Sequence, residues 1–169
     1  MLSLLDNSLR AVNFVFLIIV LGLTGNLIAT RHRVSSRVNF ALFAAVFGMV
    51  FDSIYAVLAN FISAFAWPIL LVTWDFLNMV FTFAAGTALA VGIRGGSCSS
   101  RHFVRKNKIS ENSKDRCRKA QASTVFLYFS FFIFLVKFVL SVINVISTGG
   151  FGTTSTRRGG VGAPTIAQI

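Results

Sequence analysis

The sequence is poor in charge, and above all in acidic side chains. Only 12% of its 169 residues are charged, with five Asp and Glu residues against 16 Lys and Arg residues. By contrast, 55% of the residues are hydrophobic and the mean hydropathy is +0.76. Such a composition excludes a disordered chain and an ordinary soluble globule. The length holds four membrane spans and leaves little for a separate soluble domain.

Residues that support catalysis are also scarce. The two histidines, His32 and His102, lie in different loops, and we find no G-x-S-x-G, H-E-x-x-H, P-loop or dinucleotide fingerprint. Two cysteines with His102 and no fourth ligand make a poor zinc site. We therefore expect no enzyme, no metal and no cofactor. We also expect no cleavable secretory signal, because the apolar run after Arg10 is too long and no A-x-A site follows.

Long apolar stretches predict an all-α integral membrane protein, a four-helix transmembrane bundle. The expected spans are about residues 9–29, 38–63, 68–93 and 120–147. A helix of about 20 residues crosses the hydrocarbon core, so each stretch is long enough. We expect an N-terminal cap at residues 1–8, with Ser8 capping the first helix, a long loop at 94–119 and a flexible tail at 148–169.

The third span carries the most distinctive pattern. Asp75 and Asn78 are three residues apart and therefore share a helix face. We expect them to bond polar side chains of neighbouring helices, or to meet a lipid headgroup or a sterol hydroxyl, and we favour the first. Ala84, Ala88 and Gly92 are spaced by four residues, a pattern that lets helices pack closely.

Asp52 and Lys137 are ionisable residues inside the second and fourth expected spans. Both spans run the same way, and both residues lie about 15–17 Å from the same face, near the middle of the membrane. An ion pair between them could serve a proton or substrate pathway, as in a small transporter or channel subunit. It could also fix helix register, which we favour for one isolated pair in a small protein without an inverted repeat.

The cysteines and the basic residues give opposite topologies. Cys98 and Cys117 lie in the loop 94–119, where they can form a disulfide on the oxidising side of the membrane, remain free thiols, or carry palmitate. Most of the 16 basic residues lie in the loops after spans one and three. The positive-inside rule therefore places these loops in the cytosol and the termini outside. Because the net charge of +11 sits mostly in short loops, we expect no nucleic-acid partner.

Several short motifs follow one another in a fixed order along the chain. They are Arg33-Val34-Ser35-Ser36-Arg37-Val38-Asn39, Asp52-Ser53-Ile54-Tyr55, Trp67-Pro68, Asp75-Phe76-Leu77-Asn78, Phe81-Thr82-Phe83, Gly86-Thr87, Cys98 and Cys117-Arg118. This ordered set resembles the fungal Nce-type non-classical export proteins, small four-span proteins of the MARVEL-domain superfamily. The resemblance covers nearly the whole length, and its most specific part runs from Trp67 to Phe83.

The resemblance implies a multi-pass protein of the fungal plasma membrane with both termini in the cytosol. It implies a non-enzymatic organiser of furrow-like lateral domains, the eisosome compartments, that responds to sphingolipid levels and has a link to non-classical protein export. The expected partners are membrane lipids (sphingolipid, sterol and anionic lipid), eisosome-type scaffold proteins and further copies of the chain. For topology, we follow the resemblance and the cysteine pair over the charge count.

Overall fold

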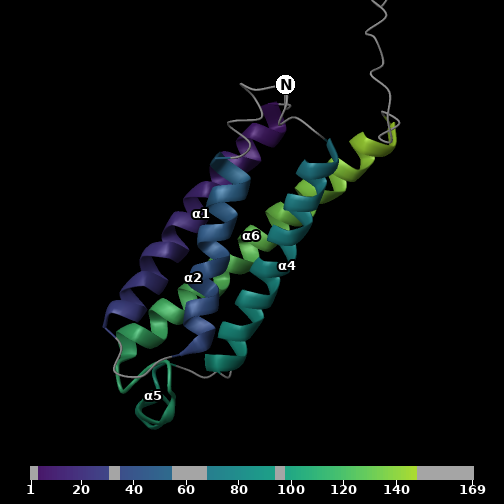
Figure 1. Cartoon of the computed structure of the whole chain (residues 1–169). Coiled ribbons are helices and arrows are strands. Elements are labelled where there is room, and N and C mark those ends of the chain that lie inside the picture. The colour runs from purple at the N-terminus through teal and green to yellow at the C-terminus, as the bar shows by residue number, and fades with distance from the viewer. Residues whose placement is uncertain (1–3, 31–34, 55–67, 94–97, 148–169) are drawn as a thin grey trace, which may run out of the picture.

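The computed structural model describes residues 4–30, 35–54, 68–93 and 98–147, and every regular element in these ranges is a helix (Figure 1). Along the chain, the elements are α1 (Leu4–Ala29), α2 (Ser36–Gly48), the π-helix η1 (Met49–Ile54), α4 (Pro68–Ile93), α5 (Arg101–Lys106) and α6 (Lys114–Ser147). Among these described elements, α1, α4 and α6 are long and apolar enough to cross a membrane. The all-helical membrane class is thus confirmed. The expected second span, 38–63, is described only as far as Ile54, and its remainder lies outside the described residues.

The long helices form a closed ring of neighbours. Helix α1 packs against α2 and α6, and α4 packs against α2 and α6. Figure 1 shows an elongated molecule in which α1 and α4 begin at the end where α6 finishes, while α5 lies at the opposite end. We call these the N-terminal end and the α5 end.

Apolar packing is concentrated at the α5 end. Its buried cluster combines the last turns of α1 and α4 with the first turns of α2 and α6, including Leu27, Ala44, Leu89 and Ala120. The outer surface of the long helices is also apolar, as Val15, Val91 and Ile143 are each more than half exposed. In water such a surface would be unfavourable, whereas in a bilayer it meets hydrocarbon chains.

Two helices begin earlier than the sequence led us to expect. Helix α1 begins at Leu4 rather than residue 9, so residues 4–8 are not a cap, and an ion pair of 2.8 Å between Asp6 and Arg10 supports its first turns. Helix α6 begins at Lys114 rather than residue 120. Ser113 precedes it, and its Oγ accepts a hydrogen bond from the Arg116 amide. In both helices, charged residues mark where the apolar part begins, but the helix itself begins earlier.

Candidate functional site: a buried charge cluster

Five ionisable side chains meet inside the helices near the N-terminal end. We call them the charge cluster: Asp6, Arg10, Asp52, Asp75 and Lys137. Lys137 is 0% exposed, and Asp52 and Asp75 are 1% and 2% exposed. The cluster draws on α1, η1, α4 and α6, so it joins four helical segments at one level. Buried charges are stable only when paired, and these are paired across helices.

Asp52 is the centre of the charge cluster. Its Oδ1 accepts a hydrogen bond of 2.6 Å from Arg10 Nη1 and also pairs with Lys137 Nζ, while its Oδ2 accepts one of 3.0 Å from Asn13. The same Arg10 nitrogen donates to the backbone carbonyl of Asp52 at 3.1 Å. Asp52 lies in the π-helix η1, a type of segment that is frequent at functional sites. Asp52 thus presents both a carboxylate and a backbone carbonyl to Arg10 of α1.

Asp75 is held from the other side of the cluster. Its Oδ1 lies 3.0 Å from Lys137 Nζ, and its Oδ2 accepts a hydrogen bond of 3.0 Å from Ser141. Arg10 Nη2 is 4.0 Å from the same Oδ2. Lys137 thus bridges Asp52 and Asp75, and it also lies 5.0 Å from the centre of the Phe134 ring, which favours a cation.

The charge cluster lies toward the N-terminal end of the bundle. Lys137 lies six residues before the end of its candidate span, at Ile143, and Asp75 lies six residues after the start of its own, at Ile69. Six residues correspond to about 9 Å along a helix. The expected position near the middle of the membrane stays a prediction, because it depends on where the hydrocarbon boundaries fall along these helices.

Asn78 takes no part in the cluster. It is 1% exposed, and neither its side-chain oxygen nor its nitrogen has a hydrogen-bond partner among the described residues. Among the described residues, Asn78 therefore makes no hydrogen bond to a neighbouring helix, and the expected bond stays a prediction. Its position is nevertheless close-packed, since a Cβ added to Gly48 would lie 3.6 Å from Asn78 Oδ1.

Sequence reasoning missed the contribution of α1. Asp6, Arg10 and Asn13 are spaced by four and three residues, which places all three on one face of an otherwise apolar helix. That polar row was the available signal. It was overlooked because the expected boundary at residue 9 divides the row, with Asp6 in the expected cap 1–8 and Arg10 at the start of the expected span 9–29. Arg10 is instead only 6% exposed.

The charge cluster holds three carboxylates and two cations. Together they can fix the register of four helical segments, because sliding any one of them by a turn would separate an ion pair. The described residues contain no group of three or more His, Cys, Asp or Glu side chains arranged for a metal ion.

The small residues of α4 occupy two kinds of position. Ala84, Ala88 and Gly92 are each partly buried, whereas the neighbouring Ala85 and Gly86 are buried. The row expected from the sequence therefore lies at the border of the packed face of α4. The buried residues Ala85 and Gly86 belong to that face itself.

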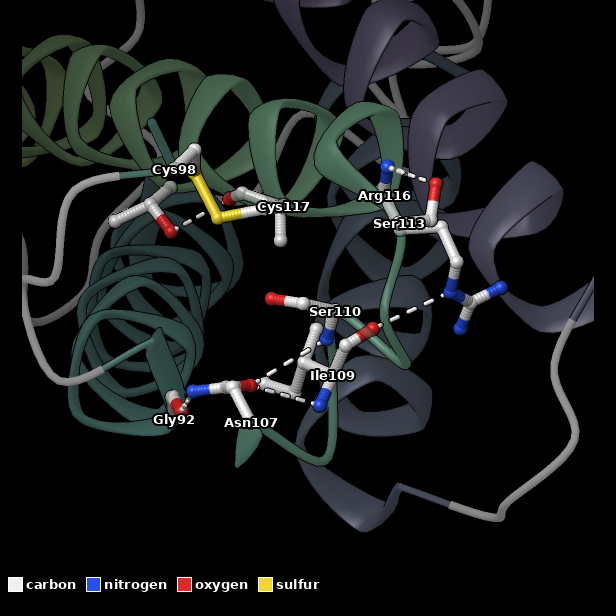
Figure 2. The surroundings of a disulfide bond; sticks show 10 residues. Gly92, Cys98, Asn107, Ile109, Ser110, Ser113, Arg116 and Cys117 are labelled. Atoms are coloured by element: carbon white, nitrogen blue, oxygen red, sulfur yellow. Dashed lines mark hydrogen bonds between the residues drawn. A yellow bond between two sulfur atoms is a disulfide. The ribbon is translucent and has the colours of Figure 1, made fainter. Parts of the chain in front are cut away.

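The α5 end is tied together by a disulfide and polar contacts (Figure 2). Cys98 and Cys117 are disulfide-bonded, with 5.7 Å between their Cα atoms. Asn107 donates to the Gly92 carbonyl at 2.9 Å and accepts from the Ile109 amide at 2.8 Å. Arg116 donates to the Ile109 carbonyl and reaches α1 through Leu27 and Thr30. The segment 98–119 is therefore packed on the bundle rather than being an open loop.

Helices with an apolar exterior and paired charges inside define a helical integral membrane protein. No solved structure matches the chain. The MARVEL family, described as a membrane-associating domain, matches residues 3–140. The chain is 55% identical to Non-classical export protein 2 of Saccharomyces cerevisiae, 52% to Non-classical export protein 102 of Candida albicans and 48% to Non-classical export protein 2 homolog 1 of Saccharomyces cerevisiae. Each match covers the full length of both chains. The chain therefore belongs to the fungal Nce-type non-classical export proteins of the MARVEL family, as its motifs indicated.

Proposed function

We propose that the protein is a non-enzymatic organiser of lateral domains in the plasma membrane, of the furrow-like eisosome type. In this role it responds to sphingolipid levels, and its partners are sphingolipid, sterol and anionic lipid together with eisosome-type scaffold proteins and further copies of itself. The names of its relatives support a link to non-classical protein export.

The observation that carries this proposal is the charge cluster. Each of its five ionisable groups pairs with at least one group of opposite charge in the cluster, and the three most central are at most 2% exposed. Groups engaged in this way hold helices together rather than act on a substrate. What remains for function is the outer surface, which is apolar and faces lipid. A bundle with a rigid interior and a lipid-facing exterior is suited to sorting the lipids around it.

The proposed arrangement has four spans, both termini in the cytosol and the α5 end outside. The disulfide between Cys98 and Cys117 supports this orientation, because such bonds persist on the oxidising side of a membrane. The count of basic residues in the loops still favours the opposite orientation, and we follow the disulfide over that count. The test is a membrane-impermeant thiol reagent on intact cells after mild reduction. Labelling of both cysteines is expected, and its absence would place the α5 end in the cytosol.

Imaging of live cells tests the organising role. A copy tagged at its C-terminus should form static cortical patches in yeast, and the patches should disperse when sphingolipid synthesis is blocked. A uniformly distributed plasma-membrane protein serves as the control for general membrane damage. A uniform signal that ignores the sphingolipid block would refute the organising role and leave only a helical membrane protein.

A second candidate function is a small proton or solute transporter or channel subunit that uses Asp52 and Lys137. The excess of carboxylates over cations in the charge cluster favours it, together with the π-helix at Asp52, because such segments are frequent at functional sites. Purified protein in liposomes should then pass protons or a solute, and Asp52→Asn should abolish the flux. If liposomes that contain the native protein pass neither protons nor the solute, this function is excluded.

A further inference from the structure

Helices α4 and α6 share a pair of hydroxyl groups on their outer side. Thr87 Oγ1 and Tyr128 Oη lie 3.2 Å apart, and both residues are partly buried. The Tyr128 ring lies against α4 at Gly86, where an added Cβ would make ordinary van der Waals contact with Cζ at 3.6 Å. We call Thr87 and Tyr128 the hydroxyl pair.

The hydroxyl pair differs from other threonines of the bundle. Thr24, Thr73, Thr82 and Thr124 each donate to the carbonyl four residues earlier in their own helix. Thr87 instead pairs with Tyr128, and only one of the two hydroxyl protons can lie between the two oxygens. The other proton has no acceptor among the described residues. A hydroxyl proton without an acceptor in an apolar setting is costly, so the pair is suited to a lipid oxygen.

The depth of the pair matches the polar boundary of the membrane. Helix α4 has 26 residues, and Thr87 lies six residues before its last residue, Ile93. Such a helix is about 39 Å long and extends about 4–5 Å beyond a 30 Å hydrocarbon core at each end. Thr87, about 9 Å from the end, therefore lies only about 4–5 Å inside the core. The polar boundary, where lipid hydroxyl and carbonyl groups lie, is therefore within one helical turn of Thr87.

Aromatic rings continue from the hydroxyl pair toward the middle of the membrane. The Phe83 ring lies 6.3 Å from the Tyr128 ring and 5.1 Å from the Phe131 ring, and Phe132 is a further 5.1 Å away. Phe83 and Phe132 are 48% and 57% exposed, so this surface is open to lipid. It offers one hydrogen-bonding point at the membrane boundary and a broad ring surface below it.

We propose that this face binds a sterol, a lipid with a single hydroxyl and a rigid fused-ring body. The hydroxyl would accept the free proton of the hydroxyl pair, and the ring system would lie against Phe83, Phe131 and Phe132. A rigid body loses little conformational freedom on such a surface, whereas an acyl chain loses much more. The inference deepens the proposed function, on which it rests, by assigning one lipid class to one face of the protein.

The test uses the full chain reconstituted in phosphatidylcholine vesicles with a photoactivatable 3β-hydroxysterol. Labelled residues mapped by mass spectrometry should fall on α4 near Phe83 and on α6 near Phe131. Tyr128→Phe keeps the ring but removes the hydroxyl, and it should lower labelling about five- to tenfold, the loss expected for one hydrogen bond in an apolar site. Thr73→Val is the matched control, because that exposed hydroxyl bonds its own helix, and it should leave labelling unchanged.

Two further vesicle compositions decide the identity of the lipid. A photoactivatable sterol without the 3-hydroxyl should label the native chain as weakly as the hydroxysterol labels Tyr128→Phe. Excess ceramide should not displace the hydroxysterol, and displacement would assign the site to a sphingolipid and refute the proposal. Labelling that is spread over all helices, or unchanged in Tyr128→Phe, would refute it as well. Because these vesicles contain no scaffold proteins and form no cortical patches, failure here leaves the organising role to its own test.

Discussion

Replacing Lys137 by methionine tests whether the charge cluster holds the helices together. Methionine fills a similar volume without the charge, so the substitution leaves a packed side chain beside unpaired carboxylates. Lys137 pairs with both Asp52 and Asp75, the latter at 3.0 Å. At this distance and an effective dielectric constant of about 20, the Coulomb attraction of one pair is about 5 kcal/mol before desolvation. Removing one partner of a buried pair lowers the free energy of unfolding by about 3–5 kcal/mol, and we expect a loss of this size.

The two carboxylates should differ in how much they depend on Lys137. Among the described residues, Asp52 keeps Arg10 and Asn13, whereas Asp75 keeps the Ser141 hydroxyl and Arg10 at 4.0 Å. Adding Asp75→Asn to Lys137→Met should therefore restore about 2 kcal/mol, the cost of leaving a buried charged group unpaired. Adding Asp52→Asn should restore less, because it also removes the ion pair with Arg10.

Unfolding by sodium dodecyl sulfate in mixed micelles, followed by circular dichroism, gives these free energies. Val136→Met serves as the control, since it introduces the same side chain one residue away at a position that is 48% exposed. A loss below about 1 kcal/mol for Lys137→Met, the size of an exposed ion pair, would show that the cluster is hydrated and does not hold the bundle. Better rescue by Asp52→Asn than by Asp75→Asn would contradict the assignment of partners.

Four shorter predictions concern other parts of the chain. Replacing Cys98 and Cys117 by serine should lower the free energy of unfolding by about 3 kcal/mol, and a reductant should destabilise the native chain equally but not the variant. Gly92→Ala should lower the thermal midpoint through a cost of about 1–3 kcal/mol, because the added Cβ meets packed atoms at 2.5 and 3.1 Å. Gly22→Ala has open space and should stabilise by about 0.5–1 kcal/mol. Asn78→Leu should stabilise by about 1–2 kcal/mol in urea titrations, and destabilisation would reveal a hydrogen-bond partner.

The helical class could be predicted from the sequence because hydrocarbon imposes a simple rule on composition. A run such as 68–93 must be long and apolar to cross it, and α4 covers the same residues. Helix ends outside hydrocarbon obey no such rule, so the starts at Leu4 and Lys114 were missed. These ends are set by local ion pairs and caps, whose side chains are polar in loops and helices alike.

The charge cluster could be predicted only in part, for a related reason. Matched depth brought Asp52 and Lys137 together in sequence reasoning, since depth follows from counting residues along a helix. The rotation of each helix about its own axis does not follow from counting residues along it. Which carboxylate faces Arg10, and whether Asn78 meets a polar neighbour, depends on how the helices rotate about their axes. The π-helix η1 changes that rotation locally, and no residue pattern announced it.

The two ends of the bundle are held by unlike forces. Ion pairs join the helices at the N-terminal end, and apolar packing with a disulfide joins them at the α5 end. A thinner leaflet exposes the helix ends on its side to water. Water weakens ion pairs but strengthens apolar association, so thinning has opposite effects on the helix contacts at the two ends. The two ends of the bundle should therefore respond differently to a change in bilayer thickness. Thinning of the leaflet at the N-terminal end is expected to weaken the ion pairs there, whereas thinning of the other leaflet is not expected to open the α5 end.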